Sequence, residues 1–159
     1  MGIRLIFMWI MGLAACGSDS PVDQPRPEGD PCPIAEGTIT LHVASLLPGA
    51  LGSACTHGNA LEVFLVVPGS DSCSLEITEN IVAGCCGGVA KGQNPYVDLY
   101  FREAATDQAL GMQSKVVYLP ADSAPIVELN FDATPFDGSS YDSDNDGTPN
   151  VDEFCNGTL

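Results

Sequence analysis

The sequence predicts an all-β fold, an antiparallel β-sandwich held together by disulfides. Between residues 37 and 131, apolar and polar residues alternate in short runs, as they do in strands with one buried face. Glycine and proline separate these runs, for example at Pro48-Gly49 and Pro68-Gly69. Since no segment keeps a helical apolar period over three turns, we expect no long helix.

The predicted strands follow one another at short intervals along the chain. They cover residues 39–43, 61–67, 75–77, 97–101, 115–119 and 126–131. About six or seven short strands in about 95 residues suit the size class of an immunoglobulin-like sandwich. We therefore assign a β-sandwich domain to residues 36–132, and a short tail to residues 133–159.

The first 15 residues have the layout of a secretory signal peptide. Arg4 gives a positive start, residues 5–11 are apolar, and Leu13-Ala14-Ala15 precede Cys16. The apolar run is too short for a membrane span, which needs about 20 residues. A cysteine directly after Leu-Ala-Ala resembles the lipobox of bacterial lipoprotein precursors. The resemblance implies that Cys16 becomes the lipidated first residue of the mature protein. An ordinary signal peptide is the alternative.

The lipobox implies a location in the bacterial cell envelope, with the membrane as a partner through the lipid anchor. Several acyl chains together hold a protein stably on one leaflet. Because Gly17 rather than aspartate follows Cys16, the resemblance to enterobacterial sorting favours the outer membrane. Residues 16–35 contain prolines at positions 21, 25, 27, 31 and 33, so we expect them to form an extended tether.

The charge of the chain excludes one large class of partners. It carries 5 basic and 21 acidic side chains, for a formal net charge of −16. A phosphate backbone would repel such a protein, so we expect no nucleic acid as partner. The hydrophobic content of 45% is too high for a wholly disordered acidic chain.

The chain has 7 cysteines, an odd number. Lipidation of Cys16 leaves an even set that suits an exported, disulfide-bonded domain. The set is Cys32, Cys55, Cys73, Cys85, Cys86 and Cys155. A bridge between the adjacent Cys85 and Cys86 would be strained, so we expect separate partners, such as Cys55 and Cys73, that pin a loop at 84–88. The alternative is a zinc or copper site, or a redox site, formed by Cys55, His57, Cys73, Cys85 and Cys86.

The strongest chemical motif lies near the C-terminus. Residues 142–153 match the calcium-loop pattern D-x-[DN]-x-[DN]-G-x5-E. Calcium takes about 6–8 oxygen ligands and tolerates irregular geometry. The candidate ligands are the carboxylates of Asp142, Asp144 and Asp146, the Thr148 carbonyl, Asn150 through water, and Glu153 with both carboxylate oxygens. An acidic, disordered tail is the alternative.

The surroundings of the loop do not suit an EF-hand. Pro135 and Gly138 disfavour an incoming helix, only six residues follow Glu153, and Pro149 occupies position eight. The segment instead resembles a single thrombospondin type 3 repeat and is similar to dockerin-type calcium loops. The resemblance implies calcium binding and no particular activity.

The sequence thus predicts a calcium-binding surface lipoprotein with a structural or interaction role. Tyr96, Tyr100 and Arg102 share one face of a predicted strand, where a protein or glycan partner could bind. The alternatives are a periplasmic Cys/His metal or redox protein and, less favoured, a hydrolase. We expect no enzyme, because the chain contains no G-x-S-x-G, no H-E-x-x-H and no glycine-rich phosphate loop.

Overall fold

The computed structural model describes residue 32, residues 34–52, residue 55 and residues 60–159. These belong to one compact unit, Pro31–Leu159. The predicted signal peptide, Cys16 and most of the predicted tether lie outside the described residues. Within the described residues, no helix is long and apolar enough to cross a membrane.

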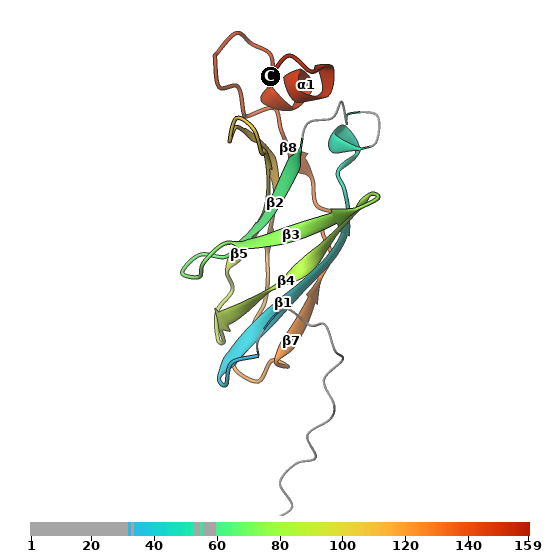
Figure 1. The fold of residues 1–159 in the computed structure, drawn as a ribbon. Coiled ribbons are helices and arrows are strands. Elements are labelled where there is room, and N and C mark those ends of the chain that lie inside the picture. Colours follow the sequence, from blue (N-terminus) through green and yellow to red (C-terminus); the bar gives the residue numbers. More distant parts are fainter. Residues whose placement is uncertain (1–31, 33, 53–54, 56–59) are drawn as a thin grey trace, which may run out of the picture. The chain divides into compact units, whose positions relative to one another are not determined.

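The described part of the chain is mostly β-structure (Figure 1). Eight strands form one sheet in the order β7-β1-β4-β3-β2-β5-β6-β8. The strands are β1 (Thr38–Leu46), β2 (Leu61–Val66), β3 (Cys73–Thr78), β4 (Ile81–Ala90), β5 (Tyr96–Glu103), β6 (Ala109–Val116), β7 (Ile126–Leu129) and β8 (Phe136–Asp137). The predicted all-β class is therefore confirmed.

Strand β3 joins the two parts of the sheet. Its first half pairs with β2, where Leu75 lies opposite Val63, and its second half pairs with β4, where Glu76 lies opposite Ala83. Figure 1 shows β3 crossing between β2 and β4, so that the sheet curls at this strand. The curl brings apolar side chains from both parts of the sheet into one hydrophobic core.

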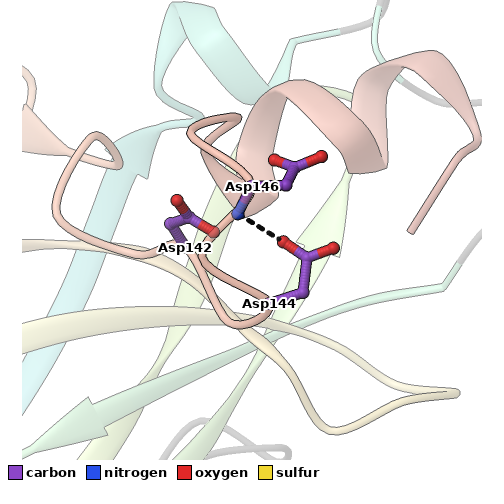
Figure 2. A group of neighbouring side chains, drawn as sticks. All are labelled: Asp142, Asp144 and Asp146. Carbon is purple, nitrogen blue, oxygen red and sulfur yellow. Dashed lines mark hydrogen bonds between the residues drawn. The ribbon is translucent and has the colours of Figure 1, made fainter.

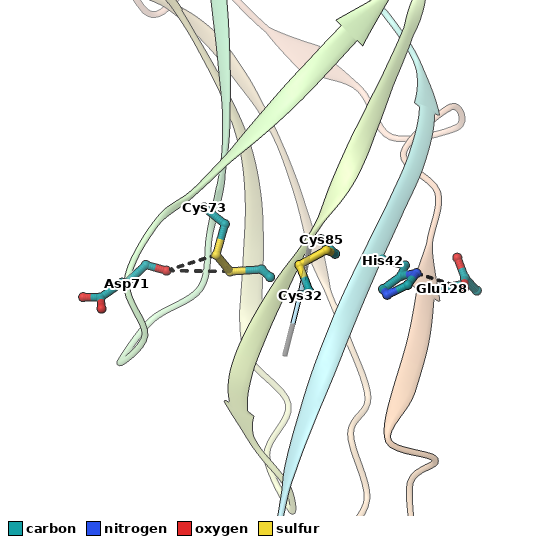
Figure 3. Close-up of a disulfide and its surroundings, with 7 residues drawn as sticks. Cys32, His42, Asp71, Cys73, Cys85 and Glu128 are labelled. Carbon is teal, nitrogen blue, oxygen red and sulfur yellow. Dashed lines mark hydrogen bonds and ion pairs between the residues drawn. A yellow bond between two sulfur atoms is a disulfide. The ribbon is translucent and has the colours of Figure 1, made fainter. Parts of the chain in front are cut away.

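One strand pair departs from the predicted antiparallel arrangement. Strand β7 runs parallel to β1, with Thr40 opposite Ile126 and Val43 opposite Leu129. Parallel neighbours need a long connection between them, and here the strands between β1 and β7 supply it. The half-buried His42 side chain faces Glu128 across this pair, with 3.6 Å between Nδ1 and Oε1 (Figure 3).

The core follows from the alternation in the strands. On β5, Val97, Leu99 and Phe101 are buried, whereas the intervening Asp98 and Tyr100 are only partly buried. Burial of such side chains removes apolar area from water and provides most of the drive to fold. The predicted strand positions 39–43, 61–67 and 97–101 all contribute buried residues to this core.

One strand and one loop differ from the prediction. The predicted strand at 115–119 overlaps only the last two residues of β6 (Ala109–Val116), and residues 84–88 lie inside β4 rather than in a loop. Glycines and cysteines at 84–88 obscured the strand pattern. Gly84 has φ +152°, a backbone conformation strained for other residues, and a Cβ atom there would come within 2.8 Å of Leu75 Cδ2.

The C-terminal tail belongs to the same compact unit as the sheet. It adds β8 beside β6 and a short helix, α1 (Asn150–Asn156), which contacts β6 and the 3-10 helix η1 (Gly49–Leu51). Val151 and Phe154 of α1 are buried in the core. A helix of two turns is too short to show a clear period in the sequence, and its packing explains why it forms.

Candidate metal site

The candidate loop runs from Asp142 into α1 and is held at both ends. On its N-terminal side, β8 pairs with β6, where Asp137 lies opposite Met112. On its C-terminal side, the buried Phe154 fixes α1 to the core. The backbone amide of Asn150 donates to the carbonyl oxygen of Tyr141 at 2.7 Å and closes the base of the loop.

The structure brings three of the predicted ligands together. Asp142, Asp144 and Asp146 each offer a carboxylate oxygen, and these oxygens lie within 4.8 Å of one another. Figure 2 shows the three side chains on successive bends of the loop before α1. Calcium binds oxygen at about 2.3–2.6 Å, so two oxygens on opposite sides of one ion lie about 5 Å apart. The cluster therefore has the size of a calcium coordination shell.

Hydrogen bonds from backbone amides give the loop its curvature. Asn145 and Gly147 donate to the two oxygens of Asp142 at 2.8 and 3.0 Å, and Thr148 donates to Asp146 Oδ1 at 2.7 Å. The amide of Asp146 donates to Asp144 Oδ1 at 3.2 Å (Figure 2). Such turns are typical of aspartate side chains. Gly147, at loop position six, has φ +94°, a backbone conformation that glycine adopts without strain.

Glu153, the predicted last ligand, lies on α1 near the aspartates. Burial raises the pKa of its carboxyl, and the negative charges of Asp144, Asp146 and Asp142 raise it further. Glu153 and Asp144 also line a cavity of about 100 Å³ beside the loop, together with Gln108, Ser143, Thr158 and Leu159. The four acidic groups therefore share one electrostatic environment, in which a bound cation would relieve their repulsion.

The sequence predicted Asn150 as a calcium ligand through water, and the structure gives its side chain other hydrogen-bond partners. Its side chain is buried, and its Nδ2 donates to the carbonyl oxygen of Ala109 at 2.7 Å and to Ser143 Oγ at 2.8 Å. Its Oδ1 accepts the backbone amide of Ser143 at 2.9 Å. These bonds connect the loop to β6. The sequence pattern indicated a polar residue at position nine but could not reveal this contact with a distant strand, nor the part that Ser143 plays in it.

The segment that follows the loop also differs from the prediction. The short tail was expected to leave no room for a normal exiting helix, yet α1 begins inside the loop at Asn150 and includes Glu153. Pro149 precedes its first residue, where a missing amide hydrogen costs nothing. In residues 132–141 the structure contains β8 and no helix, as the sequence predicted.

The cysteines of the described chain form three disulfides. Cys32 pairs with Cys85, Cys55 with Cys155, and Cys73 with Cys86. Adjacent residues of a strand point to opposite faces, so Cys86 faces the core and Cys85 faces outward. Figure 3 shows the two bridges leaving β4 in different directions. Separate partners for Cys85 and Cys86 are thus confirmed, whereas the suggested pairing of Cys55 with either is wrong.

The disulfides bear on the alternative Cys/His metal site. Cys55, Cys73, Cys85 and Cys86 all have their sulfur atoms in disulfides, so none offers the thiolate that zinc or Cu(I) binds. His57 lies outside the described residues. Both sulfurs of the Cys73–Cys86 bridge lie 3.7–3.8 Å from the Asp71 carbonyl oxygen (Figure 3). The Cys73–Cys86 bridge therefore fixes the start of β3, and the turn that contains Asp71, to β4.

Comparison of the chain with family models, with curated proteins and with solved structures finds no match.

Proposed function

We propose that this protein binds calcium through its C-terminal loop, with Asp142, Asp144, Asp146, the Thr148 carbonyl and Glu153 as ligands and Asn150 as the residue that holds the loop on β6. The observation that carries this proposal is the convergence of three carboxylate oxygens within 4.8 Å, on residues spaced as in a calcium loop. Calcium would offset the mutual repulsion of these carboxylates, and it would order the loop between β8 and α1.

The proposed site is a low-affinity one. It is a single loop, and extracellular calcium modules bind at about 10⁻⁴–10⁻³ M. Its role is structural, or it supports an interaction with a protein or glycan partner at the cell surface. The proposal assigns no catalytic step to the chain.

Isothermal titration with CaCl₂ tests calcium binding directly. We expect one site of millimolar or tighter affinity, and loss of its heat signal in Asp144→Ala. Asp152→Ala is the matched control, because Asp152 also carries a carboxylate but is exposed on α1 at a loop position without a ligand. Absence of heat at millimolar calcium, or equal loss in both variants, would overturn the proposal.

We also propose that the protein is exported and anchored to the bacterial envelope, in the outer membrane, through a lipid on Cys16. The lipobox-like residues 13–16 support this proposal. Cleavage before Cys16 would remove Trp9, the only tryptophan of the chain. The mature protein from membranes should therefore lack tryptophan fluorescence and partition into detergent, whereas Cys16→Ser should leave the precursor uncleaved. Tryptophan emission from the purified membrane form would contradict cleavage.

At the level of the fold, we propose that the curled sheet is a variant of the immunoglobulin-like β-sandwich. The shared core between β1–β4 and β2–β5 supports this, as does the change of partner along β3. An experimental structure in which the two parts of the sheet do not face each other would contradict it.

A further inference from the structure

The outer face of β2, β5 and β6 exposes tyrosine side chains to solvent. Directly opposite residues of antiparallel strands point to the same face, and Tyr96 lies opposite Val116 on β6. Tyr96 is 65% and Val116 52% exposed. Tyr118 follows two positions beyond Val116, between the buried Val117 and Leu119, and is 72% exposed. Tyrosines in such a row are typical of interaction surfaces.

A carboxylate accompanies these tyrosines. Asp98 lies on the same face, next to Tyr96 in the period-two order, and accepts a hydrogen bond from Ser114 Oγ at 2.6 Å. Tyr100 continues the face two positions further along β5, opposite Met112. The face therefore combines aromatic rings with negative charge.

The other end of the same face already contains a cation on an aromatic ring. The Arg102 guanidinium lies 4.5 Å from the centre of the Phe64 ring, and its Nη2 lies 2.7 Å from Glu62 Oε2. Asp107 pairs with the same guanidinium. At this end of the face, Arg102 thus forms a cation–π contact with Phe64 and ion pairs with the two carboxylates, as a basic side chain can.

The Tyr96–Tyr118 end receives no such cation from the described residues. Besides Arg102, the basic residues of the described chain are Lys91 and Lys115. Lys91 Nζ donates to the Ser123 carbonyl oxygen at 3.1 Å, and Lys115 Nζ donates to the Asn130 carbonyl oxygen at 2.7 Å beside the Phe131 ring. All three are bound within the chain, whose formal net charge is −16. The free end of this face is complementary to a positive partner.

We propose that Tyr96, Asp98, Val116 and Tyr118, named here the tyrosine face, dock a lysine- or arginine-rich segment of a partner protein. A basic side chain lies over a tyrosine ring and pairs with Asp98, and its aliphatic stem packs on Val116. Anionic partners are disfavoured by the charge of the face. A neutral glycan would stack on the rings and donate its hydroxyls to Asp98, but it would form no ion pair and no cation–π contact.

The test is a titration of the full chain with an octa-arginine peptide, with octa-glutamate as the charge-reversed control. At about 0.15 M salt the Debye length is about 8 Å, so attraction to the overall charge is weak and contact is required. Tyr96→Ser/Tyr118→Ser removes both rings and leaves the charge unchanged. We expect this variant to bind octa-arginine about 5- to 30-fold more weakly, since each exposed cation–π contact contributes about 0.5–1 kcal/mol. The matched control is Leu46→Ser/Ile81→Ser, which alters another exposed apolar pair and should change affinity less than twofold.

A second variant keeps the test valid if the tyrosine variant folds poorly. Asp98→Asn retains the acceptor for Ser114, removes one charge and should also weaken binding. Asp144→Ala should bind the peptide as the parent does, which separates this proposal from the calcium site. Equal peptide affinity in the tyrosine variant, Asp98→Asn and the parent would overturn it. So would tyrosine-dependent binding of a neutral oligosaccharide such as cellohexaose without binding of octa-arginine.

Discussion

The side-chain amide of Asn150 donates a hydrogen bond to the carbonyl oxygen of Ala109 at 2.7 Å, across 41 positions of the chain. One residue thereby connects the base of the candidate calcium loop to β6 of the sheet. Because Asn150 is buried, its bonds form away from water, where an unpaired polar group is costly. The loop is consequently part of the folded unit and not an appended tail.

Asn150→Ala should destabilise the protein and weaken calcium binding together. Its loss leaves the Ala109 carbonyl and the Ser143 amide without their partner, at a cost of about 1–3 kcal/mol. Urea unfolding in EDTA measures the stability, and calorimetric titration measures the affinity. Asn94→Ala, at an exposed position, serves as the control and should change neither.

Calcium should raise the melting temperature of the protein. With a Kd of about 10⁻⁴–10⁻³ M, 10 mM calcium contributes about 1.4–2.7 kcal/mol to the free energy of unfolding by mass action. Scanning calorimetry with and without calcium measures this shift. Sodium chloride of equal ionic strength should have a smaller effect, and a shift that persists in Asp144→Ala would assign it to general screening.

Gly111→Ala should detach β8 from β6. A Cβ atom there would lie 2.5 Å from the Asp137 carbonyl oxygen and collide with the Phe136 ring, and Gly111 has φ +153°. Such overpacking costs about 1–3 kcal/mol. Denaturant unfolding measures the loss. Gly49→Ala is the control, since a Cβ atom there meets nothing within 4 Å, and comparable losses in the two variants would contradict the predicted clash.

Removal of the Cys55–Cys155 bridge should cost more stability than removal of Cys73–Cys86. The two bridges span 100 and 13 positions, and the longer loop restricts the unfolded chain more. In the chain-entropy model the difference is about 2 kcal/mol. Paired alanine variants compared by denaturant unfolding measure it. A larger loss from the short bridge would show that native contacts, rather than unfolded-chain entropy, determine the ranking.

Asp132 should make the protein sensitive to acid. The Leu46 amide donates to Asp132 Oδ1 at 2.7 Å and lowers the pKa of this carboxyl, with a further contribution from Asn130. A lowered pKa in the folded state stabilises above the unfolded value of about 3.9, and the contribution is lost as pH falls through the folded value. Unfolding in EDTA between pH 6 and pH 2 should thus depend less on pH in Asp132→Asn than in Asp122→Asn. Identical pH profiles would exclude the role of Asp132.

Short-range patterns in the sequence predicted the features that depend on neighbouring residues. Alternation located the strands around Val43, Val63 and Leu99, and adjacency of Cys85 and Cys86 implied separate partners. The first follows from the period of two along a strand, and the second from the strain of a bridge between neighbours; both are local properties. The spacing of the aspartates likewise predicted which carboxylates converge, because a loop of twelve residues determines its own curvature.

Features that depend on distant segments were not predictable in this way. The residues around Ile126 do not indicate that β7 runs parallel to β1. Likewise, the residues around Cys55 do not identify Cys155 as its disulfide partner. Residues 84–88 of β4 were predicted as a loop because of their glycines, and the sequence does not show that Gly84 has φ +152° and lies close to Leu75 on another strand. The contact of Asn150 with Ala109 is of the same kind, since it joins two segments that meet only after folding.

The Cys32–Cys85 bridge determines where a mechanical load enters the domain. Strands β1, β2 and β3 all lie between these two cysteines, inside a covalent loop of 53 positions. A pull on the chain before Cys32 therefore passes through sulfur to Cys85 in β4, which is flanked by β1 and β3 in the sheet. The first three strands therefore lie inside the covalent loop, and the load reaches β4 at Cys85, which is paired with His42 of β1, while β3 holds the start of β4 at residues 81–83.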